Sequence, residues 1–474
     1  MKSLTASFKD NIRMLDGRLR VKENFDIVGK DLVIGERKAR MYLVDGFIKD
    51  EVMEKIMEYI MALNTEDMTL AHTAKEFSDR YVTYVETDES DQTEEIVTAV
   101  LSGTLALLIE GYEFAVMIDA RTYPVRNVQE PEDDRVLRGA RDGFVETLVF
   151  NTALIRRRIR DPKLTMDIQQ VGSVSRTDVV LCYMEDAVDR KLLDKLKKKI
   201  AGISISTLTM GQESLAECLV KTQWYNPFPK VRYTERPDAA AASALEGNVL
   251  IIVDNSPSVM VIPSGLLDFL QDTNDYYFPP LVGTYLRFVR MGVFLLTLLL
   301  TPVWFLLIQN PDAIPSWLEF IKVAEPNDVP IIWQLLIIEF IIDGLKIASL
   351  NTPTVLSNSF SIVGALILGD FAVQARWFVP EVVLYMAFVA IANFTQPSFE
   401  LGYAFKLFRV LILVLTALFN IWGFAAGLVL MLVIIATTRT VGGKSYLYPL
   451  VPFDGRALGR LLIRQPINRN NTHH

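Results

Sequence analysis

The stretch GTYLRFVRMGVFLLTLLLTPVWFLLIQ, residues 283–309, contains the point near Phe288 at which the chain changes character. Before that point charged residues come every few positions, whereas only fourteen Asp, Glu, Lys or Arg occur between Met291 and Ala436. A helix of about 20 mostly apolar residues is long enough to cross a bilayer. The first part of the chain is therefore expected to lie in water and the second part in lipid.

The composition narrows the classes of function. The chain has 474 residues, is 51% hydrophobic and carries a formal net charge of −8. Most of the negative charge belongs to the part before Phe288, which argues against a nucleic-acid-binding surface. The two cysteines, Cys182 and Cys218, are too few for a disulfide framework and indicate a reducing compartment. The first fifteen residues lack the apolar core of a secretory signal.

The part before the break is predicted to be an α/β cytoplasmic N-terminal region with two subdomains, residues 1–125 and 138–277. In the first, the strand-like runs MYLVDGF, YVTYVET and FAVMIDA alternate with helical patterns at residues 50–63 and 91–109. This is the βαβ rhythm of a small sheet covered by helices. The polar, proline-bearing stretch at residues 125–134 indicates a linker.

The second subdomain is predicted to begin with a long helix at residues 143–159. Strands are expected at LTMDIQQVG and TDVVLCYME, a helix at residues 189–203, and a final strand pair at NVLIIVD and VMVIP. The long helix ends in a basic run made of Arg156, Arg157, Arg158, Arg160 and Lys163. Two interpretations stay open for this run: a solvated helix end, or a contact with a neighbouring subunit or anionic lipid.

Residues 288–437 are predicted to form an α-helical polytopic membrane domain with four to six crossings. Its apolar segments are residues 292–308, 329–350, 359–373, 380–394 and 410–436. The last is longer than one crossing requires, and Asn420 and Gly423 are candidates for a break that makes it a hairpin.

The orientation of this domain follows from its flanking charges. Arg287 and Arg290 precede the first segment, whereas the loop at residues 310–328 is acidic, so the head is expected in the cytoplasm. The basic tail, residues 438–474, is expected there too, which requires an even number of crossings.

Three charged residues, Glu339, Asp343 and Lys346, form a stripe inside one apolar segment. Their i, i+4, i+7 spacing places them on one face of a helix. Charges at bilayer depth are costly unless they face water, a partner or an ion. Three interpretations stay open: an ion pathway, a helix lying along the interface with the stripe in water, and a buried structural ion network.

A row of small residues follows, made of Ser361, Ala365, Gly369 and Ala372, with Gly364 beside it. Such rows allow close helix packing, or leave a narrow lumen when several copies surround an axis. Asp370 ends the row, and a ring of such carboxylates would favour cations at a pore mouth.

Enzymatic motifs are scarce, so we expect no enzyme, no cofactor and no metal. The GGKS at residues 442–445 lacks the first glycine of a phosphate-binding loop, because Thr438 stands at that position. His72 is the only histidine before the terminal pair, which excludes a histidine-based triad or metal cluster.

The residues from Asn226 to Pro263 carry a family resemblance. Their motifs NPFP, TERPD, LEG, a strand ending in VD and an SP turn resemble the GerA family of spore germination proteins, A-subunit type. GTYLRFVR, LLIIEFIIDGLK, SIVGALILGDFAVQA and TRTVGGKSYLYPLVPFD are also similar to that family. The resemblance covers residues 130–466, and the wording FVPEVVLYMAFVAIANFTQPSFELG is closer to the stage V sporulation protein AF branch.

The resemblance implies a multi-pass protein of the spore inner membrane that acts in germination. It implies a homo-oligomeric channel for monovalent cations that releases ions, or amplifies their release, together with a small membrane partner or other germination receptor subunits. The ion pathway would be lined by the Glu339 stripe or the small-residue row. A non-conducting scaffold of a receptor complex and a secondary transporter are the alternatives, although no internal repeat supports a transporter.

The same motifs suggest residues that couple the head to the membrane domain. Arg236 and Asp238 of TERPD either clamp the head to a neighbour or cap a helix that begins at Pro237. The other candidates from these motifs are Glu235, Glu246 and Asp254.

Overall fold

A computed structural model gives the structure of the chain, and it describes residues 3–48, 50–82, 86–121, 139–220, 223–324, 328–351 and 372–464. The chain divides into two compact units. We call Met1–Lys221 with Val231–Pro263 the head, and Thr222–Lys230 with Ser264–His474 the helical unit. Residues 264–277, which the sequence analysis assigned to the second subdomain, belong to the helical unit, as does the basic tail.

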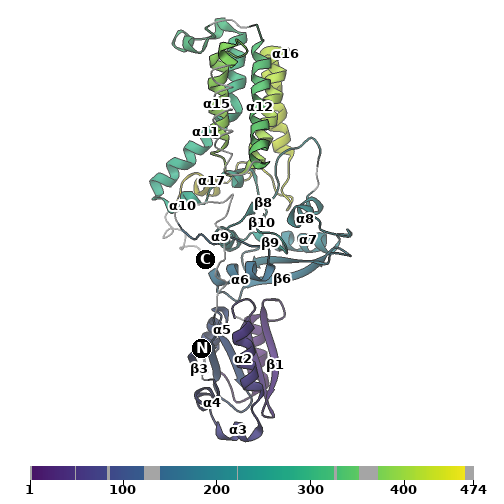
Figure 1. Ribbon diagram of the computed structural model, residues 1–474, viewed down its shortest axis with the longest axis vertical. Coiled ribbons are helices and arrows are strands. Elements are labelled where there is room, and N and C mark those ends of the chain that lie inside the picture. Colours follow the sequence, from purple (N-terminus) through teal and green to yellow (C-terminus); the bar gives the residue numbers. More distant parts are fainter. Residues whose placement is uncertain are drawn as a thin grey trace. The chain divides into compact units, whose positions relative to one another are not determined.

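The first subdomain of the head is a five-stranded sheet between two layers of helices, coloured purple to blue in Figure 1. The strand order is β1-β2-β4-β5-β3, and every pairing among the described residues is antiparallel. Its elements are α1 (Phe8–Leu19), β1 (Ile27–Ile34), β2 (Arg37–Val44), α2 (Asp50–Met61), α3 (Thr65–Leu70), α4 (Ala74–Tyr81), β3 (Glu86–Ser90), α5 (Thr93–Leu101), β4 (Leu105–Ile109) and β5 (Ala115–Asp119).

A two-residue turn explains why this sheet begins with an antiparallel hairpin. Ile34 pairs with Arg37, and the residues between them, Gly35 and Glu36, have φ values of 48° and 68°. Positive φ at both central residues is the geometry of a type I′ turn, whose twist matches that of paired strands. The hairpin was not predicted from the sequence.

The helix predicted over residues 91–109 is wrong in its second half. α5 ends at Leu101, a turn with φ of 97° at Gly103 follows, and β4 occupies Leu105–Ile109. β4 is an inner strand buried on both faces, because alternate side chains pack against α2–α4 on one side and against α1 and α5 on the other. A strand buried on both faces is continuously apolar and therefore lacks the alternation by which strands are recognised.

The second subdomain is another antiparallel sheet, of order β6-β7-β9-β10-β8. Helices α6 and α9 cover one face, and α7 packs beside β6. Its elements are α6 (Leu148–Arg158), β6 (Leu164–Val171), β7 (Thr177–Met184), α7 (Arg190–Ala201), α8 (Gln212–Leu219), β8 (Arg232–Thr234), α9 (Pro237–Leu245), β9 (Val249–Val253) and β10 (Val259–Ile262).

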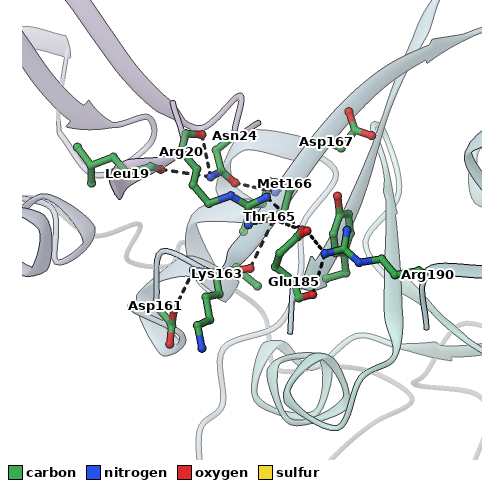
Figure 2. Close-up of polar contacts among 12 residues, drawn as sticks. Leu19, Arg20, Asn24, Asp161, Lys163, Thr165, Met166, Asp167, Glu185 and Arg190 are labelled. Atoms are coloured by element: carbon green, nitrogen blue, oxygen red, sulfur yellow. Dashed lines mark hydrogen bonds and ion pairs between the residues drawn. The ribbon is translucent and has the colours of Figure 1, made fainter. Parts of the chain in front are cut away.

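Polar contacts join the two subdomains along the outer strand β6, as Figure 2 shows. The Asn24 side chain accepts a hydrogen bond from the Met166 amide at 2.9 Å, and the Phe25 amide donates to the Met166 carbonyl at 3.2 Å. Arg20 donates to Thr165 at 2.8 Å and pairs with Glu185 at 3.1 Å. The loop after α1 thus extends the edge of the second sheet and satisfies backbone groups that an open edge would leave unpaired.

Arg156 makes the most buried contact of this junction. Its guanidinium is fully buried and pairs with both oxygens of Asp26, at 2.8 Å from Nε and 3.0 Å from NH2. NH1 donates to the Leu164 carbonyl at 3.1 Å. For Arg156 the expected solvated or lipid-facing helix end is wrong, because its guanidinium is fully buried against Asp26. This partner was not recognised because Asp26 lies 130 positions earlier in the chain.

The helical unit contains short 3₁₀ turns and longer helices. The elements are η1 (Leu266–Leu270), α10 (Asn274–Tyr277), α11 (Pro280–Gln309), η2 (Pro311–Ala313), η3 (Ser316–Ile321), α12 (Ile331–Asn351), α14 (Ala372–Gln374), α15 (Pro380–Asn393), α16 (Phe399–Thr437) and α17 (Gly455–Leu462). Among the described helices, α11 and α16 have the length and hydropathy needed to cross a membrane.

α16 folds back on itself at Asn420, whose φ of 52° and ψ of −132° are not helical. A Cβ added to Gly427 would lie 3.3 Å from the Cα of Ile412. In one straight helix these positions would be about 22 Å apart along the axis. The predicted hairpin is therefore present, and each arm has about the 20 residues that a crossing requires.

The predicted fold class is confirmed: an α/β region with two subdomains precedes a helical region with apolar helices. The βαβ rhythm gives the correct mixture of helices and strands, but the described pairings are antiparallel rather than parallel.

The Arg156–Asp26 pair gives a test of the junction. We expect Arg156→Met to lower the free energy of unfolding of the head by about 3 to 5 kcal/mol, because it leaves Asp26 buried without its partner. Thermal unfolding of the purified full-length protein measures the change.

Arg158→Met is the matched control on the same helix. Arg158 pairs with Asp142 at a partly exposed site, so this substitution should change the free energy of unfolding by about 1 kcal/mol or less. Asp26→Asn added to Arg156→Met should restore part of the loss, and an equal loss in both single variants would contradict this account.

Candidate functional site

The charged stripe lies on α12 inside the helical unit. Glu339 is buried, with 6% of its surface exposed, and Asp343 lies one turn later with about a third of its side chain exposed. α12 packs against α15 and α16. The i, i+4 spacing therefore carries both carboxylates to the side of α12 that faces other helices.

Glu339 is paired with two cations of α16. Arg409, which is 2% exposed, donates from NH2 to the Glu339 carboxylate. Lys406 lies 3.8 Å from the same carboxylate and 3.4 Å from the Glu339 carbonyl oxygen. A guanidinium and an ammonium beside a buried carboxylate offset much of the cost of burying its charge.

Lys406 also forms an ion pair with Asp343, so that its ammonium lies between the two carboxylates. Lys346, the third residue of the stripe, directs its ammonium elsewhere. Its ammonium lies over the rings of Phe394 and Tyr403, 5.5 Å and 5.4 Å from their centroids. These distances are typical of cation–π contacts.

The network extends from α16 to α11 through Arg409. NH1 of Arg409 donates to the Thr297 carbonyl at 2.6 Å, and the Gln396 side chain donates to the Thr297 hydroxyl at 3.2 Å. Thr297 lies on α11 and Glu339 on α12, so one guanidinium joins three helices. Separating α12 from α16 would leave buried charges without partners, which is strongly unfavourable.

We call Glu339, Asp343, Lys346, Lys406 and Arg409 the charge network. Because it has two carboxylates and three cations, its formal charge is positive by one. The sequence analysis expected charges at this depth to face water, a partner or an ion. In the structure both carboxylates have protein cations, Lys406 and Arg409, as partners. An ion pathway along the stripe stays a prediction.

Lys406 and Arg409 were missed because they precede the apolar run at residues 410–436 and were not assigned to a membrane segment. The sequence nevertheless contains a pattern that indicates these two cations. Two cations at i, i+3 in FKLFRV, just before a long apolar run, lie on one helix face and require partners there.

The rest of the predicted ion pathway cannot be placed. Ser361, Gly364, Ala365, Gly369 and Asp370 lie outside the described residues. Their assignment to a pathway therefore stays a prediction.

The residues predicted to couple the two units all make contacts within the head. Arg236 is buried and donates twice to Asp238, at 3.0 Å and 2.6 Å, at the start of α9, which begins at Pro237 as one interpretation required. The Glu235 carbonyl accepts from the Phe144 amide, and Glu246 is the C-cap of α9. Asp254 accepts from the Leu148 amide at the first turn of α6 at 3.2 Å. A coupling role for these residues stays a prediction.

A different motif of this sequence, NPFP at residues 226–229, lies in the helical unit. Thr222–Lys230 belongs to the helical unit, although the residues on both sides belong to the head. Phe228 is buried there, stacked on Phe408 with centroids 5.4 Å apart and edge-on to Phe405 at 5.5 Å. We call residues 222–230 the NPFP loop.

Polar contacts hold the NPFP loop on both sides of Phe228. Asn226 donates to the Thr438 hydroxyl at 2.8 Å, where α16 ends. The Tyr446 hydroxyl donates to the Pro229 carbonyl at 2.6 Å. The motif was quoted in the sequence analysis only for its resemblance, because a short aromatic loop does not reveal its partner.

No group of three or more His, Cys, Asp or Glu with metal-site geometry occurs among the described residues.

Comparison with known proteins gives the following relatives. A family model described as Bacillus/Clostridium GerA spore germination protein matches residues 16–474. The chain is 39% identical over 461 residues to stage V sporulation protein AF of Bacillus subtilis (strain 168), covering 96% of this chain and 92% of that protein. It is 28% identical to spore germination protein KA of the same strain, covering 94% and 82%.

Two further matches are relevant. The uncharacterized membrane protein YfkQ of Bacillus subtilis (strain 168) is 30% identical, with 78% of this chain and 72% of that protein covered. Among solved structures, the N-terminal domain of the A subunit of the Bacillus megaterium spore germinant receptor GerK3 matches 55% of this chain and 96% of that chain, with 22% identity and a TM-score of 0.42.

The resemblance found in the sequence motifs is thereby confirmed. The family match extends over almost the whole chain, and the alignment with stage V sporulation protein AF is as extensive. This chain belongs to the GerA family of spore germination proteins.

Proposed function

We propose that this chain is a membrane subunit of a spore germination complex and that several copies form a path for monovalent cations. We further propose that the charge network holds α12 and α16 together in the closed state, and we call this pairing the latch. The relatives named for spore germination and sporulation support a germination subunit. The apolar helices α11 and α16, with the relative named as a membrane protein, support a membrane location. No enzymatic step is part of this proposal.

The observation that carries the latch is the pairing of α12 with α16 by buried charges. Charged side chains inside a bilayer usually have a function, because apolar side chains would hold helices together at a lower cost in free energy. In the paired arrangement the network has an excess positive charge and offers no site to a cation. We therefore propose that α12 and α16 must change their pairing before the Glu339 and Asp343 carboxylates can face an ion.

Lys406 is the residue best placed to change partner. Its ammonium is already within 4 Å of both carboxylates, so a small displacement of the Lys406 side chain would favour one over the other. Exchange between two anions avoids leaving the ammonium unpaired in a dry interior.

We propose that the NPFP loop transmits motion of the head to this network. Phe405 and Phe408 contact Phe228, and Lys406 and Arg409 follow them by one position each on the same helix. Successive residues of a helix are about 100° apart around its axis. A rotation of α16 that relieves or tightens the Phe228 contact therefore also moves both cations.

The proposed orientation has the head and the basic tail in the cytoplasm of the developing or dormant spore, next to the inner membrane. Arg287, Arg290 and the cations of the tail support it through the positive-inside rule. The proposed partners are further copies of this chain, a small membrane subunit and other germination receptor subunits.

A non-conducting scaffold is the second candidate. The observation in its favour is that both carboxylates of the network have protein partners, as a static helix junction would require. Ion flux and latch variants distinguish the two.

Removing one pair of the latch tests the proposal. We expect the double substitution Glu339→Gln with Arg409→Gln to raise basal potassium flux in liposomes about tenfold, if the pair favours the closed state by about 1.4 kcal/mol. Neutralising both partners avoids an isolated buried charge. Glu319→Gln with Lys322→Gln is the matched control, since this pair is exposed and should leave the flux unchanged.

Two outcomes would count against the latch. Absence of flux from a verified oligomer, in wild type and variant alike, supports the scaffold. Reduced flux with an altered potassium to sodium ratio shows that the carboxylates line the path instead.

Truncation of Phe228 tests the NPFP loop. Phe228→Ala should destabilise the helical unit by about 3 to 5 kcal/mol, because it removes a buried ring from an aromatic cluster, and the milder Phe228→Leu should retain folding while altering basal flux. Thermal stability of the detergent-purified protein and liposome flux are the measurements. Trp224→Ala is the control in the same loop, because Trp224 is 97% exposed and should affect neither. Unchanged flux in a folded Phe228→Leu protein would contradict the proposed coupling between the NPFP loop and the charge network.

A further inference from the structure

The segment after α16 exposes a group of large apolar side chains. Leu450, Val451 and Phe453 are 42%, 55% and 75% exposed. They lie in a tight turn closed by a hydrogen bond of 2.9 Å from the Tyr448 hydroxyl to Asp454. The Leu450 amide donates to the Leu447 carbonyl at 2.7 Å, which holds the turn. We call residues 448–453 the apolar turn.

Helix α17 follows directly and is amphipathic. Leu458 and Leu461 pack against the apolar core that contains Phe228 and Tyr446, whereas Arg456 and Arg460, one turn apart, are exposed. Asp454 caps the helix by accepting from the amides of Arg456 and Ala457, both at 3.0 Å. Asp454 is the only acid between residues 438 and 464, where five Lys or Arg occur.

The level of α17 along α11 can be read from one side chain. Arg287 of α11 donates from NH1 to the carbonyls of Arg460 and Leu461, at 3.1 Å and 2.8 Å, at the end of α17. Arg287 lies one turn before Met291, where the apolar part of α11 begins. α17 therefore lies where the membrane-crossing segment meets the polar surface, which is the level of lipid headgroups.

We propose that the apolar turn and α17 form an anchor for anionic lipids, in which Leu450, Val451 and Phe453 enter the interface and Arg456 and Arg460 bind lipid phosphates. An exposed apolar group beside basic residues, at the end of a crossing helix, has the composition of an interfacial membrane contact. Its occupant is the lipid leaflet, because the charges complement phosphate and the surface is continuous with the membrane-crossing helices. The anchor requires that the helical unit crosses a membrane and does not depend on ion conduction.

Phe453→Cys labelled with bimane tests the anchor in the full-length protein. Cys218→Ser removes the exposed cysteine, while Cys182 is fully buried and burial raises the pKa of its thiol to about 12, so it should not react. The protein is reconstituted into liposomes whose acyl chains carry bromine, which quenches bimane on contact. We expect quenching in phosphatidylcholine and roughly twofold stronger quenching when phosphatidylglycerol is added.

Charge variants distinguish binding of Arg456 and Arg460 to lipid phosphates from insertion of the apolar side chains alone. Arg456→Gln with Arg460→Gln should abolish the effect of phosphatidylglycerol, whereas Arg157→Gln with Arg160→Gln removes the same charge from the head and should retain it. Absence of quenching in both lipids overturns the anchor. Efficient disulfide cross-linking between copies of the unlabelled Phe453→Cys variant, without quenching, would show that this surface is a subunit contact instead. Equal quenching in both lipids would refute the phosphate contacts.

Discussion

Arg409 makes contacts on which the arrangement of the helical unit depends. One guanidinium binds the Glu339 carboxylate of α12 and the Thr297 carbonyl of α11 while belonging to α16. In an apolar bundle, packing alone leaves helices free to slide or rotate at modest cost, because lipid and leucine are equally apolar. A buried charge with directional partners removes that freedom. The same requirement explains why α12 tolerates two carboxylates: α16 supplies a cation near each of them.

The chain passes between the two units more often than a head joined to an anchor requires. It leaves the head at Lys221, returns at Val231 and leaves again at Pro263. The first excursion is the NPFP loop, whose ring is buried beside Phe405 and Phe408. The loop is held in the helical unit, and along the chain it is continuous with the head at both ends. Within the helical unit, Phe228 thus contacts the helix that carries Lys406 and Arg409.

How much of this could be predicted from sequence depended on whether the signal was local. The apolar segments, the fold class, the family and the break at Asn420 were recognised because composition and motifs are local properties. β4 was taken for helix because burial on both faces removes the alternation of a strand. For Arg156 the two interpretations were a solvated helix end and a contact with a neighbouring subunit or anionic lipid, because nothing near it in the sequence reveals Asp26. The acids of the charge network were found and its cations were missed, since a charge inside an apolar run is conspicuous and one at its margin is not.

The restraints on α16 indicate which motion remains possible for it. At its turn, Asn420 exchanges two amide hydrogen bonds with Asn310 of the chain after α11, at 2.6 Å and 3.0 Å. Toward the other end of the arm, Phe405 and Phe408 are held by Phe228. An arm held at both ends cannot slide along its axis without breaking one of these contacts. We propose that the motion left to the arm is a rotation about its axis, in which the rings tilt within their aromatic cluster while the amide pair at the turn is kept. In the proposed latch, such a rotation would change the distances from the Lys406 ammonium to the Glu339 and Asp343 carboxylates.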